Sequence, residues 1–221
     1  MIKKGVIIAG GEGTRLRPLT YEMPKALIPL HGNPIVDYAI GLFFEHKAYN
    51  IWFALGGKLY GQILDKFPGN PFWLDTHTES RAMIRLDTGG WLNRLANGED
   101  ASAWNDDFYV CNADNLVNFN LSEALEQHKK SGCAVTIISV NVPDVREYGS
   151  ISIKDDKVES FEEKSEVEKS GWINSGYYIF SPKVFDIVKG FERDLNEPFS
   201  LERDLFPELA KQGLLGVVKE T

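Results

Sequence analysis

The chain has 221 residues, which at about 150 residues per domain allows one large domain or two small ones. Its composition, with 43% hydrophobic, 12% aromatic and 25% charged residues, is typical of a folded globular protein and excludes disorder, collagen and coiled coil as the main state. The net charge of −8 argues against broad binding of nucleic acid or anionic membranes, although residues 1–25 carry five basic side chains against two acidic ones.

The expected strands and helices alternate along the first 140 residues. Apolar runs of strand length lie at residues 2–8, 51–55, 71–75, 108–111 and 134–140. Segments with helical periodicity lie between them, at residues 34–47, 58–67, 88–96 and 121–130. This alternation predicts an α/β fold, with a doubly wound parallel sheet and crossover helices.

After Pro143 the pattern changes to short alternating stretches separated by charged residues. Strands are expected at residues 148–153, 157–162 and 173–180, paired antiparallel. Two helices at residues 182–189 and 201–212 precede a last apolar stretch at 214–218. No repeat or linker divides the chain, so we expect one domain over residues 1–221 whose second half begins near residue 143.

The sequence has few cysteines and no clear pattern of a signal peptide or membrane span. The two cysteines, Cys111 and Cys133, are too few and too far apart for a zinc site or a disulfide framework, which fits a reducing compartment. The apolar run after Lys4 is short for a signal peptide, and no run approaches the ~20 residues of a membrane span. We expect a soluble, cytoplasmic protein with no membrane or nucleic-acid partner.

A glycine-rich loop follows the first expected strand directly, with the sequence AGGEGTRLRP at residues 9–18. Its glycines allow a tight turn that presents backbone N–H groups to a phosphate, and Arg15 and Arg17 are charged donors for phosphate oxygens. Leu16 stands where a dinucleotide-binding loop needs glycine, and the Walker pattern is absent. The strand before the loop favours phosphate binding over a solvated turn.

The continuation of this loop carries a family resemblance. GTRLRPLT is followed by MPKALIPL at residues 23–30 and GNPI at residues 32–35. Together these segments resemble the signature of the sugar-1-phosphate nucleotidyltransferase family. The resemblance extends, with gaps, over essentially the whole chain. The resemblance implies a Rossmann-like, mostly parallel mixed sheet of the glycosyltransferase-A-like type. It also implies the reaction of an NTP with a sugar 1-phosphate to give an NDP-sugar and pyrophosphate, with residues 1–142 binding nucleotide and residues 143–221 binding sugar phosphate.

The resemblance assigns the nucleotide side to three segments. Lys25 contacts phosphates at the reacting centre, and the turn LDTGG at residues 86–90 contacts the nucleoside. The residues implied in nucleotide binding are Ala9, Gly10, Gly11, Gly13, Thr14, Arg15, Thr88 and Gly89. Taken alone, Asp87 or Thr88 could instead cap the following helix.

Asp114 follows the apolar strand near residues 108–111, at the edge where open α/β sheets bind ligands. Its carboxylate could share Mg²⁺ with phosphate oxygens, as this ion prefers, or cap the next turn. Both reactants are anions, so the reaction needs positioning and charge compensation by Arg15, Lys25 and Mg²⁺ rather than a covalent nucleophile. Ala113 departs from the glycine usual in the family.

On the sugar side the resemblance implies backbone contact at Gly149, sugar hydroxyl binding by Glu163 and Asn174, and phosphate binding by Lys164. The segment FSLE at residues 199–202 indicates a helix cap at Ser200 followed by a packing face.

Base and sugar stay open. The sugar-side segments resemble those of small guanylyltransferases, which implies GTP with a mannose- or heptose-type sugar 1-phosphate, for surface polysaccharide or cell-wall precursors. The alternatives are a UTP-dependent uridylyltransferase, a phosphocholine cytidylyltransferase and a non-catalytic nucleotide-sugar-binding subunit. Homo-oligomer formation is also open. The family's second metal-binding aspartate, expected on a strand after residues 214–218, is absent, which we interpret as a shortened chain.

Overall fold

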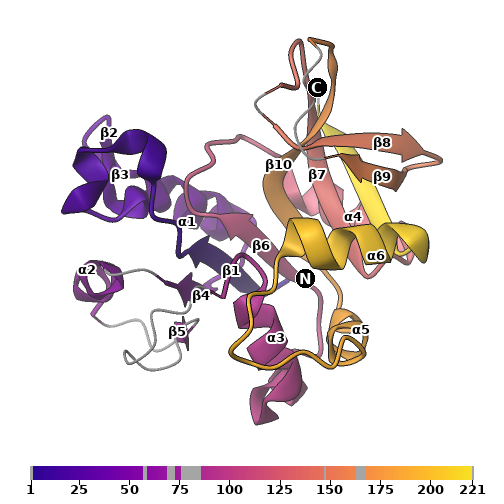
Figure 1. Cartoon of the computed structure of the whole chain (residues 1–221), viewed down its shortest axis with the longest axis horizontal. Helices are drawn as coiled ribbons and strands as arrows, with labels where there is room; N and C mark the ends of the chain where they lie inside the picture. Colours follow the sequence, from indigo (N-terminus) through magenta and orange to yellow (C-terminus); the bar gives the residue numbers. More distant parts are fainter. Residues whose placement is uncertain are drawn as a thin grey trace.

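The computed structural model describes residues 2–56, 59–68, 73–75, 86–146, 148–162 and 168–220. Within them a nine-stranded sheet runs through the molecule in the order β5-β4-β1-β6-β10-β7-β11-β9-β8, with β10 also pairing to β8 (Figure 1). Its strands are β1 (Lys4–Ala9), β4 (Asn50–Leu55), β5 (Trp73–Asp75), β6 (Phe108–Asn112), β7 (Val135–Val142), β8 (Ser150–Lys154), β9 (Lys157–Glu162), β10 (Gly171–Phe180) and β11 (Leu215–Glu220). A separate small sheet pairs β2 (Pro29–Leu30) with β3 (Asn33–Pro34).

The helices of the described residues connect these strands. The α-helices are α1 (Ile35–Glu45), α2 (Tyr60–Lys66), α3 (Gly90–Asn97), α4 (Leu121–Ser131), α5 (Val184–Lys189) and α6 (Phe206–Lys211). Short 3₁₀ turns lie at Thr14–Leu16, Leu19–Tyr21, Lys25–Leu27 and Glu99–Ala103, and a π-helical turn at Leu201–Leu205.

The sheet is mixed, as the sequence predicted. Strands β5, β4, β1 and β6 are parallel to one another. Strand β10 then runs antiparallel between β6 and β7, β11 lies parallel to β7, and β8 and β9 form an antiparallel pair. The Rossmann-like α/β fold is confirmed, with the parallel strands gathered in the first half of the chain and the antiparallel pairing of residues 148–180 in the second.

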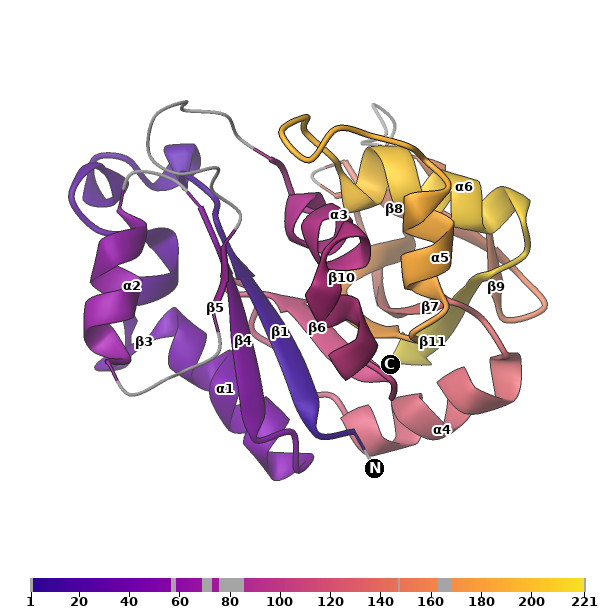
Figure 2. The same ribbon diagram turned by 90° about the horizontal axis from the view of Figure 1, so that it is seen from below.

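Each face of the sheet is covered by helices because side chains alternate along the strands. Phe108 and Val110 of β6 join one buried apolar cluster, with residues of α3, α5 and α6. Tyr109 and Cys111, the intervening residues, join the other cluster, with residues of α1, α2 and α4. Figure 2 shows α1 and α2 on one side of β1 and β4, and α3 on the other.

Aromatic side chains fill much of the first cluster. Trp91 and Trp104 are buried, and both lie edge-on to the ring of Phe108. Cys111 and Cys133 are free and buried, and burial raises the pKa of the Cys111 thiol. These two tryptophans therefore serve core packing.

Two predicted helices differ from the structure. The helix expected at residues 88–96 begins at Gly90, so Thr88 and Gly89 lie in the turn before it. The helix expected at residues 201–212 divides into the turn Leu201–Leu205 and α6, with a proline at the start of α6. Pro207 has no backbone N–H to continue the preceding hydrogen bonds, which accounts for the break.

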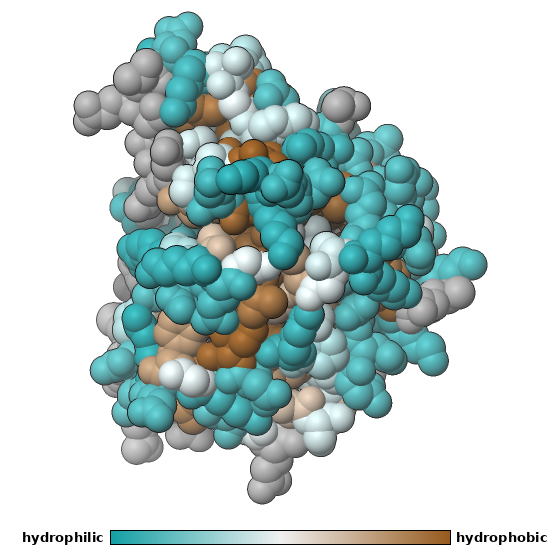
Figure 3. All heavy atoms as spheres, turned by 90° about the vertical axis from the view of Figure 1, so that its right-hand side faces the viewer, coloured by the Kyte–Doolittle hydropathy of each residue, from teal (hydrophilic) through white to brown (hydrophobic). Residues whose placement is uncertain are grey.

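In the described part of the chain, no helix is both long and apolar enough to cross a membrane. On the face seen in Figure 3, hydrophobic residues occupy a central area that hydrophilic residues surround.

Candidate active site

The carboxyl ends of three parallel strands meet at one edge of the sheet. Ile8 of β1 lies opposite Asn112 of β6, and the N–H of Ala113 donates to the carbonyl of Ile8 at 2.9 Å. On the other side of β1, Ala9 pairs with Leu55 of β4. The glycine-rich loop, Gly56 and Asp114 therefore leave the sheet at the same edge, where open α/β sheets bind ligands.

The loop after β1 needs glycine at two positions. A Cβ atom on Gly10 would lie 3.3 Å from the Cα of Gly56. Gly13 has a φ of 58°, and a Cβ there would lie 2.7 Å from Cγ2 of Thr20, whose hydroxyl donates to the Gly13 carbonyl at 2.8 Å. Glycine thus permits both the close approach to the β4 end and the left-handed turn.

The polar groups of this loop face outward. Gly11, Thr14 and Arg15 are exposed, whereas Ala9 is buried at the end of β1. Arg17, the second phosphate donor suggested by the sequence, lies 3.5 Å from a carboxylate oxygen of Glu12 and packs over the ring of Tyr21. Arg17 thus already has a carboxylate neighbour within the protein.

Lys25 and Asp114 form an ion pair at this edge. Lys25 opens the 3₁₀ turn Lys25–Leu27 after the extended Pro24, and Asp114 follows the end of β6. Their side chains are 34% and 29% exposed, so both remain accessible to a ligand. The structure thus brings together the lysine and the carboxylate that the sequence assigned to the reacting centre.

Strand β10 packs closely against the segment that carries Asp114. Gly176 has a φ of 77°, and a Cβ atom there would lie 2.1 Å from Nδ2 of Asn115 and 2.8 Å from Nδ2 of Asn112. Nδ2 of Asn115 donates to the carbonyl of Ser175 at 2.7 Å, and the Tyr177 hydroxyl donates to the carbonyl of Asn115 at 3.2 Å. These contacts fix the segment after β6 from the second half of the chain.

Asp114 is the candidate ligand for Mg²⁺ at this edge of the sheet. Within the described ranges, no group of three or more His, Cys, Asp or Glu side chains is arranged to hold a metal ion. Mg²⁺ commonly binds through one or two carboxylates together with substrate phosphates and water. The oxygen donors of Asp114 fit an ion shared with a phosphate substrate rather than an ion enclosed by protein.

Two of the residues predicted for the sugar side lie together. The N–H of Asn174 donates to the carbonyl of Gly149 at 3.2 Å. The Asn174 amide is held at both ends, because Oδ1 accepts from the Gly176 N–H at 2.9 Å and Nδ2 donates to the Tyr178 hydroxyl at 2.9 Å. The other two, Glu163 and Lys164, lie outside the described residues.

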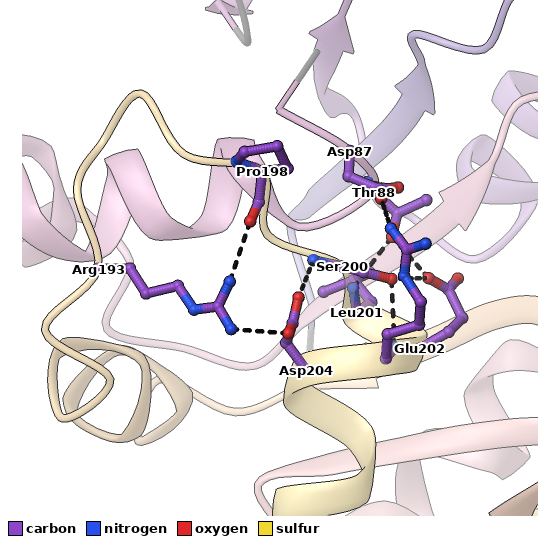
Figure 4. Close-up of polar contacts among 9 residues, drawn as sticks. Asp87, Thr88, Arg193, Pro198, Ser200, Leu201, Glu202 and Asp204 are labelled. Atoms are coloured by element: carbon purple, nitrogen blue, oxygen red, sulfur yellow. Dashed lines mark hydrogen bonds and ion pairs between the residues drawn. The ribbon is translucent and has the colours of Figure 1, made fainter. Parts of the chain in front are cut away.

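Thr88 and Gly89 lie against the segment 199–202, as Figure 4 shows for Thr88. The Thr88 hydroxyl donates to Oε2 of Glu202 at 2.6 Å and accepts from the Leu201 N–H at 3.0 Å. Helix α3 has Gly89 as its N-cap and no side-chain cap, so the capping alternative for Asp87 and Thr88 is wrong.

Ser200 does cap the turn that follows it, as predicted, accepting from the Arg203 N–H at 3.2 Å. Sequence reasoning missed Glu202 as the partner of Thr88. The only available signal was its place in the segment FSLE.

Comparison with known proteins agrees with this geometry. The family described as Nucleotidyl transferase matches residues 4–218. The chain is 32% identical to a UTP–glucose-1-phosphate uridylyltransferase of Synechocystis sp., over 96% of this chain and 56% of the relative. It is 30% identical to a mannose-1-phosphate guanylyltransferase catalytic subunit beta of Xenopus tropicalis, over 96% and 57% of the two chains.

Other relatives are nearer to this chain in length. A probable glucose-1-phosphate cytidylyltransferase of Bacillus subtilis is 30% identical, over 98% of this chain and 87% of the relative. The crystal structure of HddC from Yersinia pseudotuberculosis complexed with GMP-PN has a TM-score of 0.72 and 27% identity, over 99% and 91% of the two chains. This chain spans just over half the length of the uridylyltransferase and of the guanylyltransferase. The family match nevertheless covers nearly all of this chain. The strand-edge site and this match together show that the chain belongs to the nucleotidyl transferase family.

Proposed function

We propose that the protein transfers a nucleotidyl group from an NTP to a sugar 1-phosphate, giving an NDP-sugar and pyrophosphate. The observation that carries this proposal is the Lys25–Asp114 ion pair beside the glycine-rich loop. It places a cation and an anionic oxygen donor at the ligand-binding edge of the sheet. The relatives' names support the reaction class, since they are uridylyl-, guanylyl- and cytidylyltransferases acting on sugar 1-phosphates.

The reaction needs the site to compensate negative charge. A phosphate oxygen of the sugar 1-phosphate attacks the α-phosphorus in line, and pyrophosphate departs from the opposite side. The backbone N–H groups of Gly10, Gly11 and Gly13 and the guanidinium of Arg15 hold the triphosphate. Lys25 leaves Asp114 to contact the reacting phosphates, and Asp114 is the residue that would hold Mg²⁺. When bound, the ion neutralises phosphate charge at the reacting centre.

The two halves of the chain take different substrates in this proposal. Residues 1–142 bind the NTP, with Thr88 and Gly89 in the nucleoside-contacting turn. Residues 143–221 bind the sugar 1-phosphate, with Gly149, Glu163 and Asn174 on the sugar and Lys164 on its phosphate. The position of Gly149 beside Asn174 supports this division.

GTP with a mannose- or heptose-type sugar 1-phosphate is the proposed substrate pair. Support comes from the guanylyltransferase relative and from the similar structure solved with GMP-PN. UTP with a hexose 1-phosphate is the second candidate, favoured by the uridylyltransferase relative at 32% identity. The buried free thiols of Cys111 and Cys133 are compatible with the reducing cytoplasm that we propose as its location.

The test is a pyrophosphate-release screen of the four common NTPs against a panel of sugar 1-phosphates, with Mg²⁺. We expect turnover with one dominant pair, lost in Lys25→Ala and Asp114→Asn. Matched controls are Lys189→Ala and Asp186→Asn, which break an ion pair on α5. Strand β10 ends at Phe180, which pairs with Phe108 at the start of β6. Helix α5, which follows β10, therefore lies at the opposite edge of the sheet from Asp114, which follows the end of β6. Absence of pyrophosphate release with every pair would overturn the proposal.

A further inference from the structure

Two chain segments, residues 86–89 and 199–203, are joined by a dense set of contacts. The Phe199 N–H donates to the Leu86 carbonyl at 3.0 Å, and the Gly89 N–H donates to the Phe199 carbonyl at 2.7 Å. Arg203 and Asp87 add an ion pair at the exposed side. The turn assigned to the nucleoside is therefore anchored by a segment of the second half, as the side chains in Figure 4 show.

The Thr88 hydroxyl is hydrogen-bonded to residues of segment 199–203. A threonine hydroxyl has one proton to donate, and here that proton goes to Oε2 of Glu202 at 2.6 Å. This length is in the range of charge-assisted O–H···O⁻ bonds. The Thr88 hydroxyl oxygen itself accepts from the Leu201 N–H at 3.0 Å. Both hydrogen bonds of the Thr88 hydroxyl are therefore made to protein groups. Its role toward a nucleotide is to hold the backbone of the turn in place.

Glu202 connects this turn to the sugar side. Its Oε2 also accepts from the Ser200 hydroxyl at 3.1 Å, and Ser200 is buried. Burial first and the nearby Glu202 charge second raise the pKa of Tyr178 well above its ordinary value. The Tyr178 hydroxyl in turn accepts from Nδ2 of Asn174.

We propose that Glu202 is a positioning residue that fixes the nucleoside-contacting turn from the second half of the chain, through the hydroxyl of Thr88. The proposal rests on the proposed function for the identity of the ligand, and it concerns a residue that touches neither substrate. Its consequence is that NTP affinity depends on a carboxylate in the sugar-phosphate half.

The test uses two pairs of variants. Thr88→Val keeps the side-chain shape but removes the hydroxyl, and Glu202→Ala removes the acceptor. Each should raise KM for the NTP about tenfold, with less than a threefold change in KM for sugar 1-phosphate, because a hydrogen bond to a charged group is lost on the nucleotide side. Thr88→Ser and Glu202→Gln keep a donor and an acceptor, and should stay within threefold of the parent protein.

The double variant Thr88→Val/Glu202→Ala separates positioning from independent effects. If both residues act through one bond, its KM for the NTP rises about tenfold rather than a hundredfold. Arg193→Ala is the matched structural control, since it breaks a 2.8 Å ion pair with Asp204, the residue directly after segment 199–203, and removes no contact of Thr88 or Glu202. It should lower stability without changing KM for the NTP.

Amide hydrogen exchange at residues 86–89 gives a readout that does not depend on turnover. Faster exchange in Thr88→Val and Glu202→Ala, together with weaker NTP binding measured by calorimetry, supports the positioning role of Glu202. This holds even if the protein accepts no sugar 1-phosphate, since that result would contradict only the proposed reaction. Unchanged exchange, or faster exchange with unchanged NTP affinity, overturns the positioning role. Equal losses of NTP affinity in Arg193→Ala would also overturn it, because a general loosening would then suffice.

Discussion

Removing the Lys25 ammonium should separate stability from activity. In Lys25→Ala the ion pair with Asp114 is lost, but both side chains are about one third exposed, so solvent screens their attraction. Partly exposed pairs of this kind contribute about 0–1 kcal/mol to stability. For a chain of 221 residues, this corresponds to a Tm decrease of no more than about 4 °C.

The expected effect on catalysis is much larger. If Lys25 contacts the reacting phosphates, its loss removes charge stabilisation in a site where one such donor is worth ~3–4 kcal/mol. Turnover should therefore fall by about two to three orders of magnitude. Asp114→Ala should behave in the same way at saturating Mg²⁺, and Arg15→Ala should also cut turnover strongly while leaving the fold intact.

The assay pairs thermal unfolding with pyrophosphate release at saturating substrates. Lys189→Ala, on the α5 surface, serves as the matched lysine control and should leave both quantities near their original values. A Lys25→Ala protein that loses several kcal/mol of stability yet keeps normal turnover would refute the reasoning, because Lys25 would then be a structural residue. Normal turnover in Asp114→Ala would refute the metal assignment separately.

Three further outcomes are expected. Gly13→Ala should destabilise the protein by about 1–2 kcal/mol, measured by denaturant unfolding, because the φ of 58° at Gly13 disfavours a side chain and a Cβ would lie 2.7 Å from Cγ2 of Thr20. The same variant should weaken NTP binding, and unchanged binding would argue against the loop as the triphosphate site. Lys164→Ala should raise KM for sugar 1-phosphate much more than KM for the NTP, and equal increases would show that its assignment to the sugar phosphate is wrong. The interaction with His128, whose Nε2 lies 3.7 Å from a carboxylate oxygen of Asp107, is the main cause that lowers the pKa of Asp107. The contribution of Asp107 to stability is therefore present above the ordinary Asp pKa and is lost as pH falls through the lowered value. Asp107→Asn should make the unfolding free energy less dependent on pH below about pH 4, and an unchanged acid profile would contradict this.

The strands of the fold were predictable because their signal is local. Each apolar run of strand length near residues 2–8, 51–55 and 108–111 became a parallel strand within one or two residues of its expected bounds. The place of β11 beside β7 was not predictable, because parallel pairing between distant segments depends on the whole sheet rather than on its own sequence. The division of the helix at residues 201–212 was missed, although Pro207 is the local signal that accounts for it.

The site divides in a similar way. Loop glycines and the strand-end Asp114 carry signals in short segments, and the meeting of Lys25 with Asp114 followed only from the family resemblance. Thr88 and Glu202 contact each other across a long stretch of chain, and neither residue's neighbours indicate the other. A contact of this kind depends on how the two halves pack, which no local pattern encodes.

The burial of both thiols has a practical consequence for spectroscopy. Cys111 lies within the sheet core and Cys133 is 1% exposed, so reagents that attack thiolates find no accessible target in the folded protein. A single cysteine introduced at an exposed loop position, such as Thr14, would therefore take a fluorophore or spin label with no competing background. The natural chain is ready for site-specific labelling without first replacing its own cysteines.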